Sequence, residues 1–233
     1  RIDVPIYELV VPSTDEKIKY RPFLVKEEKL LLIAMESGKN EDILRGVKDI
    51  VDSCTFNKLK LGNMPMFDIE YIFLQIRAKA VGEVSTLRLL CQDDGKTYAK
   101  VEVDLTKIEV QVDDNHTNKI ELSDEMGVIM KYPTIDAFAE NGIEEMTPSN
   151  MIDVIVTCIS QVYDKKGEEV YDSKDSTKKE LIEFVEQMNT QQFTDVQKFF
   201  DTMPKLKHEI TVKNPKTKVE SKVVLSGLSD FFV

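Results

Sequence analysis

Apolar residues in the first third of the chain follow two different periods. Two short segments, 2–11 and 17–23, alternate apolar and polar residues on either side of a turn at Pro12, which predicts a β-hairpin. Apolar residues spaced three and four positions apart then predict three helices, over 25–35, 41–54 and 67–81. Because amphipathic helices bury their apolar stripes only against each other or against a sheet, we expect the hairpin to lie beside them.

The period changes to two after Gly82. From residue 84 to 132 apolar residues alternate with polar ones, and the runs are separated by Asp93-Asp94-Gly95 and by Asp113-Asp114-Asn115. Alternation interrupted by such turns is typical of antiparallel strands. The segment is therefore predicted to form a β module of four or five strands, with acidic turns that arise from turn chemistry rather than from a calcium site.

Helical spacing resumes after Pro133. Helices are predicted over 134–140, 148–163 and 181–188, and the stretch 164–177 is expected to be an exposed loop because it is polar and charged. Thr177 and Glu180 have the spacing of a capping box for the third of these helices. Asp175 is an alternative cap.

The last forty-four residues predict a helix, a hairpin and an apolar tail. Pro204 ends a helix whose apolar face is made by Phe193, Val196, Phe199, Phe200 and Met203. A hairpin then pairs Leu206–Val212 with Val219–Leu225 across Asn214-Pro215-Lys216-Thr217.

Chain ends are usually polar and frayed, so we expect the apolar tail to be held by something. One alternative is that it folds back on the chain's own core. The other is that it docks on a partner protein, since aromatic anchors suit such contacts. The candidate partner-binding residues are Leu225, Leu228, Phe231 and Phe232.

These elements predict an α+β fold in which amphipathic helices surround a central antiparallel β module and the chain finishes in a helix and a hairpin. Three segments are expected, namely an N-terminal hairpin with helices (1–83), the β module (84–132) and a helical region with the C-terminal hairpin and tail (133–233). The alternative is one integrated domain, which 233 residues also allow.

Composition narrows the classes of partner. The net charge of −11 disfavours duplex nucleic acid, which binds basic surfaces. No run of about eighteen apolar residues is present to span a membrane, and no signal peptide is recognised. The basic stretch 205–222 contains six lysines. It is expected either to be a solvated hairpin or to contact an acidic protein neighbour.

No catalytic or metal-binding pattern is recognised. The two histidines, His116 and His208, have no cysteine or second histidine at ligand spacing. Cys54, Cys91 and Cys158 are widely separated, and we expect buried structural thiols. Phosphate-binding glycine loops and a nucleophile elbow are both missing. We therefore predict no catalytic residues, no cofactor, no metal and no enzymatic activity.

Two runs at opposite ends of the chain resemble one protein family. The run near the start is Tyr20-Arg21-Pro22-Phe23-Leu24-Val25-Lys26-Glu27-Glu28-Lys29-Leu30-Leu31-Leu32. The run near the end is Phe199-Phe200-Asp201-Thr202-Met203-Pro204-Lys205-Leu206-Lys207-His208, followed after the hairpin by Leu225-Ser226-Gly227-Leu228-Ser229-Asp230-Phe231-Phe232. Both are similar to the baseplate hub subunits and hub-assembly proteins of T-even-type contractile-tailed bacteriophages. Many members carry a Cys-x-x-Cys knuckle in the terminal hairpin. Here Val212-Lys213-Asn214-Pro215 occupies that region, so a zinc-ribbon role is not implied.

The resemblance implies a phage tail morphogenesis protein that acts through protein–protein contacts. As a structural subunit it would lie in the virion's tail baseplate, in an oligomeric assembly with other hub, spike or wedge proteins. As an assembly factor it would act as a chaperone for the hub in the host cytoplasm and be absent from the finished particle. A tail-associated hydrolase is a remote third alternative. No nucleic acid and no membrane are implied as partners.

Overall fold

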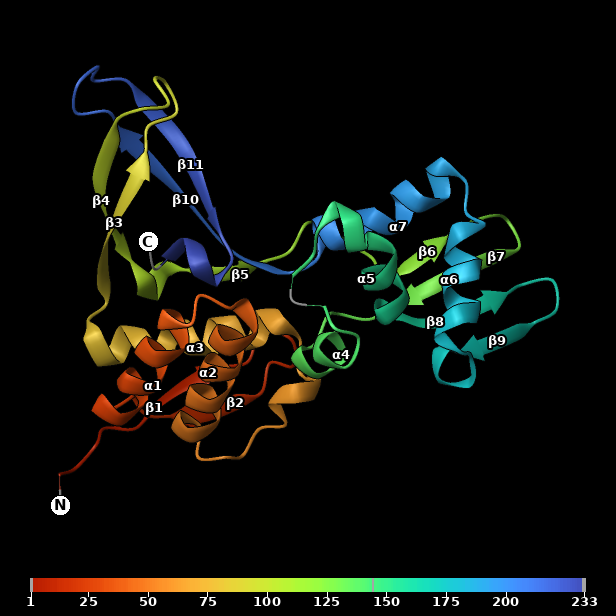
Figure 1. Ribbon diagram of the computed structural model, residues 1–233, viewed down its shortest axis with the longest axis horizontal. Coiled ribbons are helices and arrows are strands. Elements are labelled where there is room, and N and C mark those ends of the chain that lie inside the picture. The colour runs from red at the N-terminus through yellow and green to blue at the C-terminus, as the bar shows by residue number, and fades with distance from the viewer. Residues whose placement is uncertain (1, 144, 232–233) are drawn as a thin grey trace. The chain divides into compact units, whose positions relative to one another are not determined.

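The computed structural model describes residues 2–143 and 145–231, and the chain divides into two compact units (Figure 1). Unit 1 contains Arg1–Leu61, Phe67–Gln111 and Lys205–Val233, whereas unit 2 contains Gly62–Met66 and Val112–Pro204. The chain therefore builds most of unit 1, forms unit 2, and returns to complete unit 1. This division differs from the three consecutive segments expected from the sequence.

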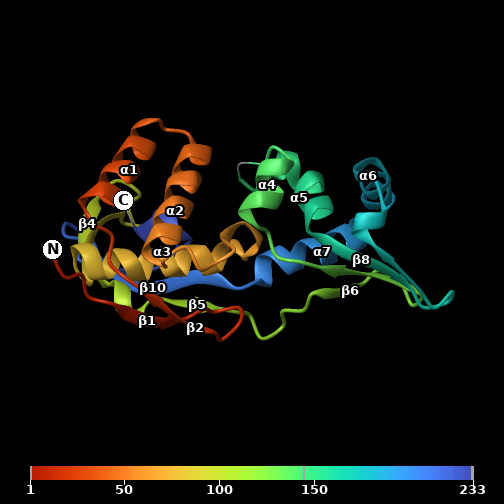
Figure 2. The same cartoon turned by 90° about the horizontal axis from the view of Figure 1, so that it is seen from below.

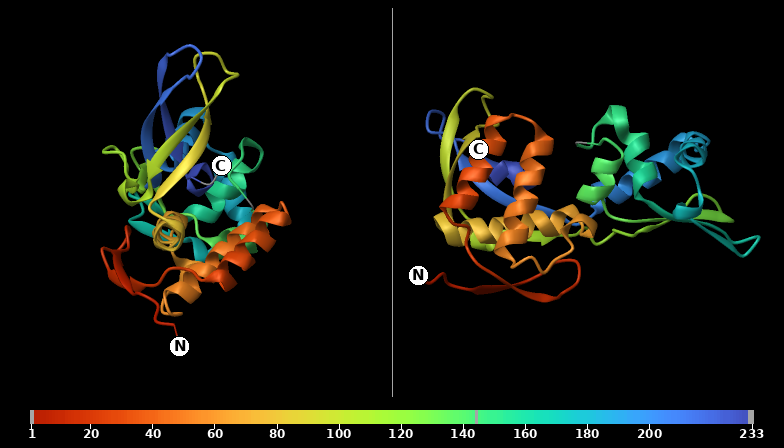
Figure 3. Two further views of the ribbon diagram at one scale, coloured as in Figure 1. Left: turned by 90° about the vertical axis from the view of Figure 1, so that its left-hand side faces the viewer. Right: turned by 60° about the horizontal axis from the view of Figure 1, so that its bottom comes forward.

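Unit 1 begins with the expected hairpin and three helices. Strands β1 (Tyr7–Val10) and β2 (Lys17–Tyr20) pair antiparallel, and helices α1 (Val25–Glu36), α2 (Asn40–Cys54) and α3 (Met66–Val81) follow. Figures 2 and 3 show α1 and α2 side by side on one side of α3 and the hairpin on the other. The hairpin is fixed to α3 through Ser13, whose amide and hydroxyl donate to the carboxylate of Asp68.

Two further hairpins complete unit 1 and lie side by side in Figure 1. The first pairs β3 (Val84–Leu90) with β4 (Tyr98–Asp104). The second pairs β10 (Lys205–Lys213) with β11 (Glu220–Ser226), and the short strand β5 (Glu109–Gln111) joins the other edge of β10. Apolar residues of the two hairpins and of α3 form a shared core that includes Leu74, Leu87, Val103, Leu206 and Leu225.

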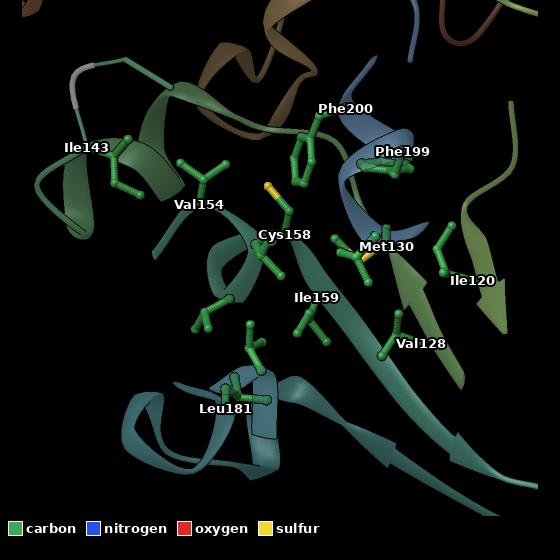
Figure 4. Close-up of a cluster of buried hydrophobic side chains, with 14 of the residues drawn as sticks. Ile120, Val128, Met130, Ile143, Val154, Cys158, Ile159, Leu181, Phe199 and Phe200 are labelled. Carbon is green, nitrogen blue, oxygen red and sulfur yellow. The ribbon is translucent and has the colours of Figure 1, made fainter. Parts of the chain in front are cut away.

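Unit 2 is a four-stranded antiparallel sheet with helices packed against it. Its strand order is β6-β7-β8-β9, made by β6 (Lys119–Glu121), β7 (Met126–Met130), β8 (Ile159–Asp164) and β9 (Glu169–Asp172). Its helices are α4 (Ile135–Glu140), α5 (Met151–Cys158), α6 (Lys178–Glu186) and α7 (Thr190–Thr202). Figure 4 shows Val128, Met130 and Ile159 of the sheet facing Phe199 and Phe200 of α7 in the buried core.

The α+β class is confirmed, but the strands expected over 84–132 do not form one central module. They join three separate sheets: β3 and β4 pair with each other, β5 pairs with β10, and β6 and β7 form one side of the sheet that β8 and β9 complete. Alternation identifies a strand and its buried face, but it carries no information about which distant strand completes the hydrogen-bonding ladder. The strands of 84–132 therefore do not form the single central β module that was expected.

Two other expectations were wrong in part. The helix expected over 148–163 ends at Cys158, and Ile159 continues directly as β8, which lies between β7 and β9. Ile159 and Val162 continue the spacing of the apolar residues before them, so this spacing did not separate the end of the helix from the start of the strand. The stretch expected to be a loop over 164–177 is exposed as predicted, but it contains strand β9, which is the edge of the same sheet.

Several local signals were read correctly. Thr177 caps α6 and forms the capping box with Glu180, and α7 ends before Pro204. In α7 the face made by Val196, Phe199 and Phe200 is buried.

No helix in the described part of the chain is long and apolar enough to span a membrane.

Candidate interaction surface

The N-terminus of α1 is fixed by a buried carboxylate. Glu27 is 2% exposed and accepts hydrogen bonds from the Arg21 guanidinium at 2.8 Å, the Leu24 amide at 2.7 Å and the Ser53 hydroxyl at 3.1 Å. Burial acts to raise the pKa of Glu27, but the hydrogen bonds outweigh it and hold the pKa at about 2. The ionised carboxylate therefore links the end of the first hairpin to both α1 and α2.

Helix α1 packs on α2 through one narrow side. A Cβ atom placed on Gly46 of α2 would lie 3.1 Å from the Cβ of Ala34, so the two helix backbones approach closely here. Within α1 only Glu27 and Ala34 are buried. In Figure 2 the two helices stand as a pair above α3. Most of the circumference of α1 is consequently left without a protein neighbour among the described residues of unit 1.

The uncovered part of α1 exposes several large apolar side chains among the charged residues Lys26, Glu28, Lys29 and Glu36. Leu30, Leu32, Ile33 and Met35 are 50–55% exposed, Val25 is 80% exposed, and Leu24 immediately before the helix is 39% exposed. A large exposed apolar patch typically marks a binding site. We name the six residues Leu24, Val25, Leu30, Leu32, Ile33 and Met35 the α1 surface.

The α1 surface was not expected from the sequence, because each of the three helices was predicted to bury its apolar stripe. That expectation is correct for α2 and α3, where Val47, Ile50, Ile72 and Phe73 are all buried. It is wrong for α1. The signal that was available is the run of six apolar residues over 30–35, since six consecutive positions cover the whole circumference of a helix and cannot all face one neighbour.

The residues that the sequence nominated for partner binding lie mainly in the core of unit 1. Leu225 is 3% exposed and Phe231 is fully buried, and both pack in a cluster with Leu74 of α3. Leu228 is partly buried against the same cluster, and Phe232 lies outside the described residues. For Leu225 and Phe231 this placement agrees with the first alternative, in which the tail folds back on the core.

The tail is also held by hydrogen bonds to its backbone. The Leu228 amide donates to Glu70 of α3 at 2.9 Å, and the Ser226 amide donates to Asp230 at 2.8 Å. Burial raises the pKa of Glu70 to about 7, and the bond from Leu228 opposes only part of that rise. The contact of the tail with α3 is therefore both apolar and polar.

A polar cluster joins the tips of the two long hairpins, and we name it the tip clasp: Asp93, Asp94, Asn214 and Thr217. Asn214 is fully buried, and its Nδ2 donates to Asp93 and to Asp94, each at 3.0 Å. The Thr217 hydroxyl donates to Asp93 at 2.5 Å. Hydrogen bonds from Thr217 and Asn214 lower the pKa of Asp93. The clasp therefore joins the tips of the two hairpins through side-chain hydrogen bonds.

The acidic turn at Asp93-Asp94 also has the local role expected from the sequence. Asp94 accepts from the Lys96 and Thr97 amides at 3.0 and 2.9 Å and from the Thr97 hydroxyl at 2.6 Å. These bonds lower the pKa of Asp94. What the sequence did not show is the link to Asn214, because a contact across 120 residues depends on how the two hairpins pack.

His116 and the three cysteines lie among hydrogen-bonding or buried neighbours. His116 lies 2.9 Å from the Thr202 hydroxyl and 3.0 Å from the Tyr132 hydroxyl, and burial lowers its pKa. All three cysteines are free and buried. Burial raises the pKa of Cys54 to about 11 and that of Cys158 to about 12, so these thiols stay protonated and are poor nucleophiles. Among the described residues no group of three or more His, Cys, Asp or Glu is placed to hold a metal ion.

The comparisons with known proteins give one result. A family model described as "T4 bacteriophage base plate protein" matches residues 4–233. No curated protein and no solved structure matches the chain. The match covers nearly the whole sequence, including both runs on which the resemblance was based. The chain therefore belongs to the T4 bacteriophage base plate protein family.

Proposed function

We propose that the protein is a structural subunit of the baseplate hub and that the α1 surface is its principal contact within the baseplate. Membership of the family supports a structural role in the tail baseplate, with other baseplate components as partners. The observation that carries the finer proposal is a helix that is fixed at its start by buried Glu27 and that exposes five large apolar side chains. Exposed apolar side chains on a helix whose start is fixed are suited to a permanent interface.

The alternative role, a hub assembly factor that leaves the finished particle, predicts a different kind of surface. Transient interfaces are smaller and more polar than permanent ones. The α1 surface consists of six large apolar side chains, and this favours the permanent subunit. Mass spectrometry of purified mature particles separates the two roles. A stoichiometric copy number supports the subunit, whereas presence in assembly intermediates alone supports the assembly factor.

The role of the α1 surface is tested by placing a charge in it. Leu32→Glu should leave the fold intact, because Leu32 is 55% exposed, but it should block incorporation of the protein into baseplates in a complementation assay. Val170→Glu is the matched control, because Val170 is 61% exposed on β9 of unit 2. Thermal melting should show both variants folded. Normal incorporation of Leu32→Glu would contradict the proposal.

A further inference from the structure

We infer that the occupant of the α1 surface is a second copy of this chain, with the two α1 helices packed antiparallel about a two-fold axis. This inference rests on the proposed role of α1 as a contact within the baseplate, and it names one of the neighbours. It follows from the order of charges along α1, from the distribution of charge between the two units, and from the apolar character of the surface.

One line of residues runs along α1 opposite its contact with α2. Val25, Lys29, Leu32 and Glu36 are spaced by four, three and four positions, which places them on a single stripe of a helix. At 100° per residue this stripe lies opposite Glu27 and Ala34, the two buried residues of the helix. Ile33 and Met35 flank the stripe and are half exposed.

The charges on this stripe complement their own copy when the second helix runs the other way. Lys29 and Glu36 are exposed, and no ion pair or side-chain hydrogen bond involving either is found in the described part of the chain. An antiparallel α1 places Lys29 of each copy near Glu36 of the other, twice by symmetry. A parallel pair would bring like charges together, which opposes association.

Glu36 is also in an unfavourable position within its own helix. The C-terminal end of a helix has a partial negative charge, which favours basic residues there. Yet the last turn of α1 contains no basic residue. A lysine from a second copy supplies the missing positive charge, so the same pairing relieves a cost that the single chain does not offset.

The distribution of charge between the two units favours such a contact through unit 1. Unit 2 contains 20 of the 42 acidic residues but only 8 of the 31 Lys and Arg residues, which gives it a formal charge of −12 and leaves +1 for unit 1. Two copies that meet through unit 2 would repel each other strongly. Two copies that meet through α1 join nearly neutral units.

The test is sedimentation velocity of the full chain over a range of about 1 to about 200 μM, where weak dimers are detected. The wild type should shift from monomer towards dimer as concentration rises. Lys29→Glu and Glu36→Lys should each weaken the dimer about tenfold, since each reverses two symmetric contacts. The double variant Lys29→Glu/Glu36→Lys should recover dimer formation, and an equimolar mixture of the two single variants should form a mixed dimer.

A matched pair in unit 2, Lys179→Glu and Glu183→Lys on α6, should leave dimer formation unchanged, because these residues form an exposed pair within one helix. A wild type that stays monomeric throughout, or a double variant that does not recover, overturns the inference. If the wild type is monomeric but Leu32→Glu is still excluded from baseplates, the occupant is another baseplate protein and the proposed function survives. If dimers form but Leu32→Glu is incorporated normally, the proposed function fails and the second-copy contact stands.

Discussion

At the scale of single residues, two carboxylates of unit 1 have pKa values that are shifted in opposite directions. Glu27 receives hydrogen bonds from Arg21, Leu24 and Ser53, and its pKa is about 2. Glu70 receives one, from the Leu228 amide, and its pKa is about 7. Burial disfavours the charged form of both groups, and the number of donors decides whether the charge is kept. The charge on Glu27 is therefore part of what holds α1 in place.

Replacing Glu27 should destabilise unit 1 severely. Glu27→Gln removes one partner of a buried ion pair and leaves the Arg21 guanidinium, whose side chain is 12% exposed, without its carboxylate. Breaking such a pair costs about 3–5 kcal/mol in the free energy of unfolding. Urea denaturation measures the loss, and Glu28→Gln is the control because Glu28 is exposed on the same turn. An equal and small effect of both changes would show that the pair contributes little.

The same residue predicts the pH dependence of stability. The pKa of Glu27 falls from its ordinary value of 4.5 to about 2 on folding, so its contribution is complete above pH 4.5 and is lost as the pH falls towards 2. The contribution is about 3 kcal/mol, at 1.36 kcal/mol per pKa unit. Urea titrations between pH 2.5 and pH 6 should show a shallower slope for Glu27→Gln than for the wild type.

A glycine in unit 2 predicts a second residue-scale effect. A Cβ on Gly127 of β7 would overlap the hydroxyl of Tyr163 and lie 2.6 Å from the Ile120 carbonyl oxygen. Gly127→Ala should lower the free energy of unfolding by about 1–3 kcal/mol or more through overpacking. Gly167→Ala is the control, because a Cβ there lies at an ordinary distance of 3.5 Å from Glu169. Similar melting temperatures for the two variants would contradict this assignment of strain.

At the scale of elements, the tip clasp connects the two long hairpins of unit 1 through side-chain hydrogen bonds. Asn214→Ala should uncouple the tips and cost about 1–3 kcal/mol, because it leaves two carboxylates without their shared donor. Hydrogen exchange should accelerate at the Lys216 and Thr217 amides, which donate to Asn214. Lys213→Ala, an exposed change immediately before Asn214, is the control. Unchanged exchange in Asn214→Ala would mean that apolar packing alone holds the tips.

At the scale of the whole molecule, charge and exposed apolar surface are segregated. Unit 2 has a formal charge of −12 and unit 1 of +1, whereas most of the exposed large apolar side chains among the described residues belong to unit 1. Like charges within a compact unit repel one another, and this repulsion is screened by salt. The two units should therefore differ in their response to ionic strength.

Raising the ionic strength from about 20 to about 300 mM shortens the screening length several-fold. This should increase hydrogen-exchange protection in unit 2, through relief of self-repulsion, while protection in unit 1 changes little. Sodium and potassium chloride should act alike, since the effect is screening and not specific ion binding. A larger response in unit 1 would contradict the electrostatic explanation.

Much of the fold could be predicted because the signals are local. The capping box of Thr177 with Glu180, the stop at Pro204 and the buried face of Val196, Phe199 and Phe200 each depend on residues within one or two helical turns. Strand Ile159–Asp164 was missed because Ile159 and Val162 continue the helical spacing of the apolar residues before them. The α1 surface was missed because helical periodicity shows which residues are apolar, not whether another element covers them.

The sequence by itself determined most of the elements, their caps, the α+β class and the membership of a baseplate family, since each of these depends on residue types at short range or on direct similarity along the chain. Only the tertiary structure decided that the strands of 84–132 separate into three sheets, that Leu225 and Phe231 belong to the core, and that α1 remains uncovered. The physical reason is that strand pairing and burial are properties of distant contacts. The local sequence indicates which residues favour burial, but contacts with distant parts of the chain determine whether those residues are buried.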